Sequence, residues 1–168
     1  MLFRSLCRKW KTKLVAEEGQ VRLLVDNYFP AREIRTSETS AAVAHVAQIR
    51  FVRDWMKAKQ RECIQFGSLV MEGRDIGSNI FPETDYKFFL DASPEVRKQR
   101  REREGVQEDV HARDKRDSSR AHSPLMPSLG AMIVDNSQHT VQETCDVMLE
   151  EINRRRKANR LAPLKPVT

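Results

Sequence analysis

Three short apolar runs that each end in polar residues constrain the fold of this chain most strongly. With their polar neighbours, the runs are Leu69–Met71 before Glu72–Asp75, Tyr86–Leu90 before Asp91, and Ala131–Val134 before Asp135. Each run predicts a buried strand, and the segments between the runs are long enough for helices. Strands that alternate with helices predict an α/β fold with a parallel sheet. Ligands of such sheets bind beyond the carboxyl ends of the strands, so we expect the polar residues together at one edge.

Local signals predict where helices of this fold begin. Ser93 can cap a helix that starts at Pro94, a residue suited to the first helical position. Thr140 and Glu143 have the spacing of a capping box, which predicts the start of the last helix. We expect the residues after Lys157 to form a loose tail.

Upstream of these runs, the sequence predicts a hairpin and two helices. Thr12–Ala16 and Val21–Asp26 are strand-like and flank Gly19, which supplies the turn. The Ala-rich segment Ala41–Gln48 favours a helix, and apolar residues between Val52 and Cys63 recur at helical spacing. We expect these elements to form a separate cap beside the sheet edge.

The composition excludes several classes of protein. With 39% hydrophobic and 32% charged residues, the 168-residue chain is typical of a globular domain rather than a disordered or membrane-spanning chain. No apolar run approaches the length needed to cross a bilayer. Three cysteines without CxxC spacing argue against a disulfide framework and a zinc site, so we expect a protein of the reducing cytoplasm.

The net charge of +6 leaves two interpretations open. A basic chain can bind nucleic acid, or it can carry a basic surface and tail around a site for a smaller anion. Basic residues bunch at 97–103 and 113–120 and are interleaved with acids, which suits a pocket for a nucleotide phosphate. No motif of a known nucleic-acid-binding module is visible, so we expect no nucleic-acid partner.

Two stretches carry residue types suited to phosphate chemistry. In Gly73–Asp75, glycine lets the backbone approach a ligand, arginine offers a planar fork for phosphate, and aspartate accepts hydrogen bonds. On a helix, the arginines of Arg113–Arg120 would share one face, which suits charge that builds on a transferring phosphate. A strand-end turn in the first case, and a solvated helix face with internal ion pairs in the second, explain the same residues without a ligand.

Taken in order, these stretches resemble the cytidylate kinase family. The motifs that carry the resemblance are Glu33-Ile-Arg35, Val52-Arg53, Gln60-Arg61, Leu69–Gly77, Phe81-Pro82, Lys87–Glu95 and Arg113–Pro124. The resemblance implies a nucleoside monophosphate kinase with the α/β fold of P-loop NTPases, in which a parallel sheet has helices on both faces. It also implies phosphoryl transfer from ATP, with Mg²⁺, to CMP or dCMP, giving CDP or dCDP, in a monomer that does not bind a membrane.

The resemblance assigns roles to individual residues of this chain. The implied substrate contacts are Arg53 to the base, Arg74 to the CMP phosphate, Asp75 to the cytosine end, and Arg113 and Asp117 to the sugar hydroxyls. The implied catalytic residues are Arg100 and Arg101, near the transferring group, and Arg120, on the phosphates. In the family, a Ser/Thr of the loop that binds ATP holds Mg²⁺, and we expect no metal ligand among the residues of this chain.

The sequence also departs from the family pattern. The family opens with a strand, a GxxxxGK[ST] loop that cradles the ATP phosphates, and a helix, and these 168 residues contain no such motif. Two explanations compete: the chain is an incomplete copy of a longer reading frame, which we favour, or it is a non-catalytic CMP-binding relative. We expect the sheet to miss its first strands and the chain as given to be an inactive fragment.

The family pattern divides the chain into predicted segments. Residues 1–11 are an N-terminal remnant, in which Met1–Ser5 match a translated sequencing adapter and are interpreted as an artefact. Residues 12–62 form the monophosphate-binding insertion, residues 63–157 the rest of the kinase core with a lid at about 100–113, and residues 158–168 a tail. Ala44 stands where the family often has a serine that touches cytosine, which puts the strength of base selection in doubt.

Overall fold

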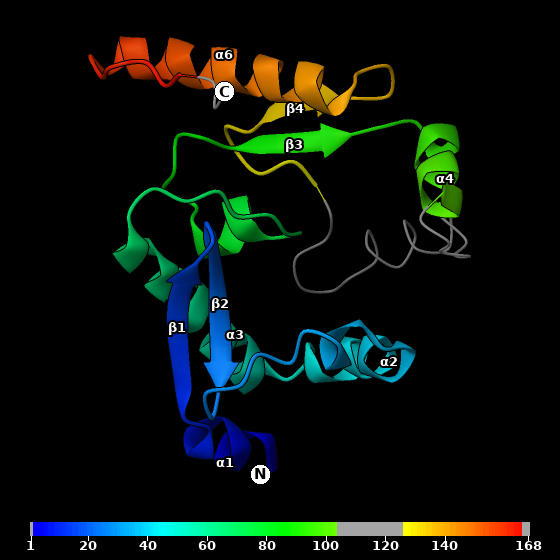
Figure 1. The fold of residues 1–168 in the computed structure, drawn as a ribbon. Coiled ribbons are helices and arrows are strands. Elements are labelled where there is room, and N and C mark those ends of the chain that lie inside the picture. Colours follow the sequence, from blue (N-terminus) through cyan, green and yellow to red (C-terminus); the bar gives the residue numbers. More distant parts are fainter. Residues whose placement is uncertain (1, 104–125, 166–168) are drawn as a thin grey trace. The chain divides into compact units, whose positions relative to one another are not determined.

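The computed structural model describes residues 2–103 and 126–165 (Figure 1). It divides into two compact units, Met1–Met71 and Glu72–Thr168, and each unit has its own two-stranded sheet. This division falls later than the predicted segment boundary after residue 62, which stays a prediction. Among the described helices, none is both long enough and apolar enough to cross a membrane.

The first unit contains an antiparallel hairpin (Figure 1). Strand β1 (Thr12–Glu17) pairs along its whole length with β2 (Gln20–Val25). The two residues between the strands, Glu18 and Gly19, both have positive φ, at 50° and 72°. Two-residue turns of this kind match the twist of the paired strands, and glycine adopts such a φ without strain. The predicted hairpin is confirmed.

Helices make up most of the rest of the first unit. They are α1 (Leu2–Lys9), the 3₁₀ turn η1 (Glu33–Arg35), α2 (Ser37–Val46), α3 (Arg50–Glu62) and the 3₁₀ turn η2 (Cys63–Phe66). The two predicted helices are confirmed, although α2 begins earlier than expected. The reason is a local cap: the Thr36 hydroxyl accepts a hydrogen bond from the Thr39 backbone N–H at 3.2 Å.

A small apolar contact joins α1 to α3. The rings of Trp10 and Trp55 meet edge to face with their centroids 6.1 Å apart, an arrangement that aromatic rings favour. Cys7 on α1 and Cys63, directly after α3, are the buried apolar side chains described in this unit. Cys7 of α1 is therefore enclosed within its own unit.

The second unit contains the predicted parallel sheet. Strand β3 (Phe88–Asp91) pairs in parallel with β4 (Met132–Asp135), and Asp91 lies opposite Asp135. Helix α4 (Pro94–Arg103) follows β3, and α6 (Val141–Ala158) follows β4 and runs alongside the sheet (Figure 1). The predicted α/β class, with a parallel sheet and helices, is confirmed.

The predicted strand at Leu69–Met71 is wrong. The segment has no strand structure, and Val70 is 97% exposed. A strand needs a neighbour for its backbone N–H and C=O groups, and in the described sheets β1 pairs only with β2 and β3 only with β4.

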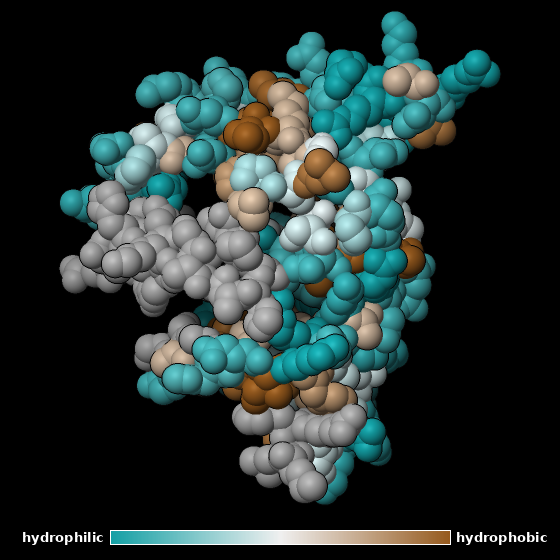
Figure 2. Space-filling model, turned by 180° about the vertical axis from the view of Figure 1, so that it is seen from behind, coloured by the Kyte–Doolittle hydropathy of each residue, from teal (hydrophilic) through white to brown (hydrophobic). Residues whose placement is uncertain are grey.

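Burial of the two confirmed strands, β3 and β4, is also lower than predicted. A two-stranded sheet has few elements to cover it, so Leu90 and Ile133 stay exposed, and Figure 2 shows hydrophobic side chains at the surface.

The start of α6 is fixed by the predicted capping box. The Thr140 hydroxyl accepts from the Glu143 N–H at 3.2 Å, and the Glu143 carboxylate accepts from the Thr140 N–H at 2.7 Å. These two bonds satisfy backbone donors that the helix itself leaves without an acceptor. The Glu143 carboxylate also accepts from the Thr140 hydroxyl at 2.8 Å. The bond from the Thr140 N–H and then this hydroxyl bond lower the pKa of Glu143, because both favour its carboxylate form.

The second half of α6 is tied to the loops that enter the sheet. Glu151 accepts from Arg154 at 2.6 Å and from Arg155 at 2.6 Å, and its side chain is 11% exposed. Arg155 in turn donates to the carbonyl oxygens of Asp85 and Gly130, which precede β3 and β4. Glu151 thus holds the guanidinium group that joins the helix to both strands.

The residues after α6 differ from the loose tail that we expected. The side-chain amide of Asn153 donates to the Leu164 carbonyl at 3.0 Å and accepts from the Leu164 N–H at 2.6 Å. Arg156 also donates to the Ala162 carbonyl. An asparagine amide can satisfy both backbone groups of one residue, so it folds this segment back against the helix.

Replacing the capping threonine tests the start of α6. We expect Thr140→Ala to lower the free energy of unfolding by about 1 kcal/mol, because the Glu143 N–H loses its acceptor. Thr140→Ser keeps a hydroxyl and is the matched control. Urea unfolding followed by circular dichroism measures both, and equal stability of the Ala and Ser variants would contradict the capping role.

The Glu151 cluster predicts a dependence of stability on pH. Hydrogen bonds from Arg154, which has the largest effect, and from Arg155 lower the pKa of Glu151 from 4.5 to about 2. A lowered pKa contributes stability above the unfolded value, and that contribution is lost as the pH falls from 4.5 toward 2. Glu151→Gln should therefore lower the melting temperature at neutral pH and flatten its fall in this acid range.

The neighbouring Glu150 provides the control for this experiment. Its side chain is exposed, so Glu150→Gln should leave the pH dependence of the melting temperature as it is in the unmodified chain. If both variants change the acid range equally, the cluster around Glu151 does not produce the effect.

Candidate functional site

The carboxyl edge of the parallel sheet brings two acidic residues side by side. Asp91 and Asp135 end β3 and β4 and are partners in the strand register. Each carboxylate accepts a backbone N–H just beyond its own strand: Asp91 from Ala92 at 2.9 Å, and Asp135 from Ser137 at 2.9 Å. The Ser137 hydroxyl also donates to Asp135 at 2.5 Å. Both bonds from Ser137 lower the pKa of Asp135, and the bond from the hydroxyl has the larger effect. This carboxyl group therefore favours its ionised form.

The loops after the two strands are joined by hydrogen bonds. The Ser93 N–H donates to the Ser137 hydroxyl at 2.8 Å, and the Asn136 N–H donates to the Asp91 carbonyl at 2.8 Å. The Ser93 hydroxyl accepts from the Val96 N–H at 3.3 Å, which confirms it as the cap of α4. Helix α4 therefore begins at a fixed position on this edge.

Two arginines of α4 return to the same edge. Arg97 Nε donates to the Ala92 carbonyl at 3.0 Å. Arg100 donates twice to Asn136, from Nη1 to the side-chain oxygen at 3.0 Å and from Nη2 to the backbone carbonyl at 2.8 Å. The fork of a guanidinium suits such a double contact and loses its rotational freedom in it. Arg100 is thus oriented at the carboxyl edge, beside the loop that follows β4.

Sequence reasoning missed Asn136 and Ser137 as residues of this edge. Both follow Asp135 directly, at the end of a predicted strand, where ligands of parallel sheets bind. Polar side chains in that position were the available signal. Only the acidic residue there was predicted.

The expected grouping of Glu72–Asp75 with Asp91 and Asp135 is not reproduced. Arg74 and Asp75 lie in a bend before the π-helical turn η3 (Ile76–Ile80). Gly77 of this turn lies against Ser128 and Lys87, which precede β4 and β3. The turn after Asp75 therefore lies at the amino ends of the strands. The physical reason is the same as above: Leu69–Met71 forms no strand in the sheet that could deliver these residues to its carboxyl edge.

The bend that holds Arg74 depends on a glycine. Gly73 has φ of 158°, and a Cβ at this position would lie 2.9 Å from the Ile76 side chain. A larger residue would have to displace Ile76, so the backbone here is closely packed. Arg74 and Asp75 are both half-buried.

The remaining predicted site residues are not part of this edge. Arg53 lies on α3 in the first unit and is half-buried, and Arg101 follows Arg100 on α4. Arg113, Asp117 and Arg120 lie outside the described residues. In the described part of the chain, no three His, Cys, Asp or Glu side chains are grouped so that they could hold a metal ion.

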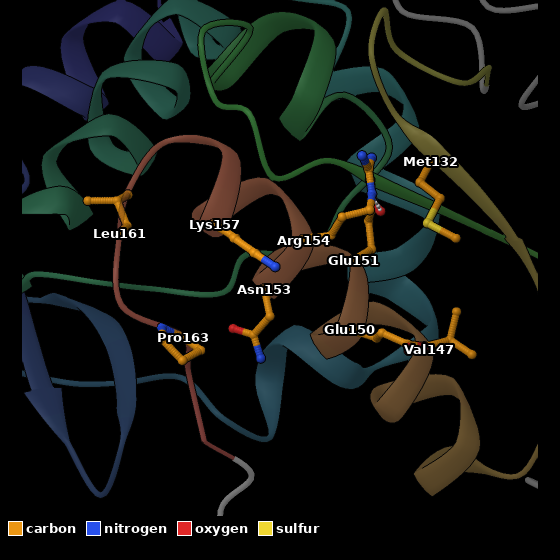
Figure 3. A pocket seen from close by; sticks show the side chains of 9 residues that line it. All are labelled: Met132, Val147, Glu150, Glu151, Asn153, Arg154, Lys157, Leu161 and Pro163. Atoms are coloured by element: carbon orange, nitrogen blue, oxygen red, sulfur yellow. Dashed lines mark hydrogen bonds and ion pairs between the residues drawn. The ribbon is translucent and has the colours of Figure 1, made fainter.

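The two hollows described in the second unit lie away from the predicted site residues. The larger has a volume of about 640 Å³ and is lined by α6, by Met132 and by the segment after α6, including Leu161 and Pro163 (Figure 3). The smaller, of about 420 Å³, lies between the loops before β3 and β4 and the end of α6. Neither is lined by Arg74, Asp75, Arg100 or Arg101. The candidate site is therefore the carboxyl edge of the sheet, where the polar side chains are oriented by hydrogen bonds.

Comparison with known proteins gives consistent matches. The family model described as cytidylate kinase matches residues 3–154. A cytidylate kinase of Clostridioides difficile (strain 630) is 40% identical over 132 residues, which are 72% of this chain and 61% of the relative. One of Marinomonas sp. (strain MWYL1) is 33% identical over 147 residues, covering 81% of this chain and 65% of the relative. One of Parabacteroides distasonis is 37% identical over 153 residues, covering 84% and 67%.

These matches bear on the N-terminal segment and on the family. The chain spans 61% to 67% of the length of these relatives. The family match begins at residue 3, so it includes part of the Met1–Ser5 stretch that we interpreted as an artefact, and Leu2–Lys9 forms helix α1. The family model covers most of the chain, and the three relatives named above are at least 33% identical to it. This chain therefore belongs to the cytidylate kinase family.

Proposed function

We propose that this chain takes part in a (d)CMP kinase reaction, the transfer of the γ-phosphoryl group of ATP to CMP or dCMP. The observation that carries the proposal is the carboxyl edge of the parallel sheet, where Arg100 is oriented by Asn136 beside Asp91 and Asp135. Ligands of parallel α/β sheets bind at that edge. Membership of the cytidylate kinase family supports the class of reaction.

Arg100 and Arg101 would stabilise negative charge on the transferring phosphoryl group. In-line phosphoryl transfer needs positioned substrates and fixed positive charge, and it needs no protein nucleophile. The two bonds to Asn136 occupy only part of the N–H donors of Arg100, since a guanidinium has five. The others can contact phosphate oxygens without reorganisation. We assign the same role to Arg120, by its match to the family pattern.

The acceptor nucleotide would be recognised by a second set of residues. We propose that Arg74 contacts the CMP phosphate and Asp75 the cytosine end, and the closely packed glycine directly before them supports this, because it lets the backbone approach a ligand. Arg53 would face the base. Arg113 and Asp117 would contact the sugar hydroxyls, again by their match to the family pattern.

The phosphate donor would be ATP with Mg²⁺. The metal ion offsets the charge of the donor phosphates in reactions of this class. The described residues offer no group of three metal-binding side chains, so we assign no residue of this chain as a ligand. The free cysteines Cys7, Cys63 and Cys145 support a cytoplasmic protein, and a monomer is proposed from the family resemblance.

Nucleotide binding by the 168-residue chain tests the proposal. Titration calorimetry with CMP, dCMP, UMP and GMP should show tighter binding of the two cytidine nucleotides than of GMP. A site made only for phosphate would bind all four alike, because they share that group. Equal affinities, or no binding of CMP, would contradict the proposed substrate.

Turnover is measured separately, by a coupled assay of ADP release with CMP and ATP. The 168 residues contain no GxxxxGK[ST] motif to cradle the ATP phosphates, so we expect a rate far below the range of about 1–100 per second found for kinases. A rate within that range would contradict the inactive-fragment interpretation. It would equally exclude the alternative of a non-catalytic CMP-binding relative.

Arg74 offers a test at the level of one side chain. Arg74→Ala should weaken CMP binding by about 2–4 kcal/mol, because it removes a charge-assisted contact to the phosphate. Arg74→Lys keeps the charge but not the planar fork, so its loss should be smaller. ATP affinity should change little in either variant.

The controls for Arg74 separate recognition from folding. Arg32→Ala removes an exposed arginine to which no role is assigned, and it should leave CMP affinity unchanged. Equal loss of CMP and ATP binding in Arg74→Ala, with a lower melting temperature, would show that Arg74 supports the fold instead. Loss of ATP binding alone would assign it to the other substrate.

A further inference from the structure

A group of unpaired cations flanks Trp10 in the sequence of the first unit. Its members, named here the basic cluster, are Arg8, Lys9, Lys11 and Lys13. All four side chains are exposed. None of them forms an ion pair or a side-chain hydrogen bond among the described residues, whereas Arg154, Arg155 and Lys59 all have carboxylate partners. The charge of the basic cluster is therefore open to an anion from outside the chain.

The excess positive charge of the protein lies in this unit. Residues 1–71 contain 13 Lys or Arg and 7 Asp or Glu, an excess of six. Residues 72–168 contain 17 of each. The net charge of +6 thus belongs to the first unit, not to the unit that contains the candidate site. An uneven distribution of this kind attracts polyanions to one part of a molecule.

The basic cluster lies where α1 gives way to β1. Arg8 and Lys9 occupy the last turn of α1, Lys11 directly precedes β1, and Lys13 is its second residue. Residues two apart on a strand lie on the same face, so Lys11 and Lys13 project to one side of the hairpin. Arg22 lies opposite Val15 and therefore shares that side, although Glu17 and Glu18 partly offset its charge at 3.7 and 3.5 Å.

Trp10 adds an aromatic surface, and it lies between Lys9 and Lys11 in the sequence. Its side chain is 39% exposed, and its ring is held edge-on by Trp55 at 6.1 Å. An exposed ring held in place is suited to stacking with a nucleic-acid base. Proteins that bind single strands without sequence preference combine such rings with cations that follow the phosphates.

We propose that the basic cluster and Trp10 bind single-stranded nucleic acid, with phosphates at the four cations and a base stacked on Trp10. A membrane surface fits less well, because an amphipathic helix needs a free apolar side to enter a bilayer, whereas α1 contacts α3 and its Cys7 is buried. This inference departs from our sequence-based expectation of no nucleic-acid partner. It does not depend on the proposed kinase function, since it concerns other residues.

Fluorescence anisotropy with a labelled uridine oligonucleotide of about 16 nucleotides tests the proposal. The logarithm of the affinity should fall with the logarithm of salt concentration with a slope of about −0.7 for each phosphate contacted, or about −3 for four contacts. Lys9→Gln/Lys11→Gln/Lys13→Gln should weaken binding at low salt by about tenfold or more and bring the slope to about −1.

A matched variant separates this site from general charge attraction. Lys98→Gln/Lys157→Gln/Lys165→Gln removes the same charge from exposed lysines of the second unit. It should keep both affinity and slope close to those of the unmodified chain. If the two triple variants lose affinity equally, or if the unmodified chain does not bind the oligonucleotide at low salt, the proposal is overturned.

The stacking contact has its own test. Trp10→Leu should weaken oligonucleotide binding by about tenfold, whereas Trp10→Phe keeps a ring and should retain most of the affinity. Circular dichroism checks that both variants are folded. Equal affinity of the Leu and Phe variants would exclude stacking at Trp10. Binding to phosphatidylserine vesicles without binding to the oligonucleotide would replace the proposed partner with a membrane.

Discussion

The parallel pairing of β3 with β4 is the constraint on which the candidate site depends. It sets Asp91 opposite Asp135, so the loops that leave the two strands begin side by side. Only then can the Asn136 N–H reach the Asp91 carbonyl and the Ser93 N–H reach the Ser137 hydroxyl. These bonds fix the start of α4 and place Arg100 within reach of Asn136. A single backbone pairing thus orients an arginine that lies 36 residues away from its partner in the chain.

Features that act within a few residues could be predicted from the sequence. The cap at Ser93, the capping box at Thr140 and the turn at Gly19 were all found in the structure, because each depends on groups that lie no more than three residues apart. The parallel pair of strands was also predicted correctly, from apolar runs that end in acids. Predictions failed where a distant partner decides the outcome. Leu69–Met71 has the composition of a strand, but a strand forms only beside another strand.

The candidate site was predicted only in part for the same reason. The resemblance to the cytidylate kinase family indicated Arg100 as a site residue. It did not indicate that Asn136 holds the guanidinium, because nothing in either local sequence encodes the contact. Arg74 and Asp75 were recognised as a unit, and the structure keeps them in a packed bend after Gly73. Their expected place at the carboxyl edge was inferred from a strand that does not form. The roles of Arg113, Asp117 and Arg120 stay predictions, since these residues lie outside the described part of the chain.

Shallow burial in both units has a consequence for how their backbones move. No large side chain among the described residues is fully buried, and Ile80 and Val134, at 4% and 3% exposure, are the most enclosed apolar side chains. Local opening of a backbone costs little where few apolar contacts must be broken. We therefore expect amide protons of β3 and β4 to exchange with solvent through local opening rather than only through complete unfolding. A nucleotide bound across the loops after these strands would slow that exchange, because the bound state must be released before the loops open.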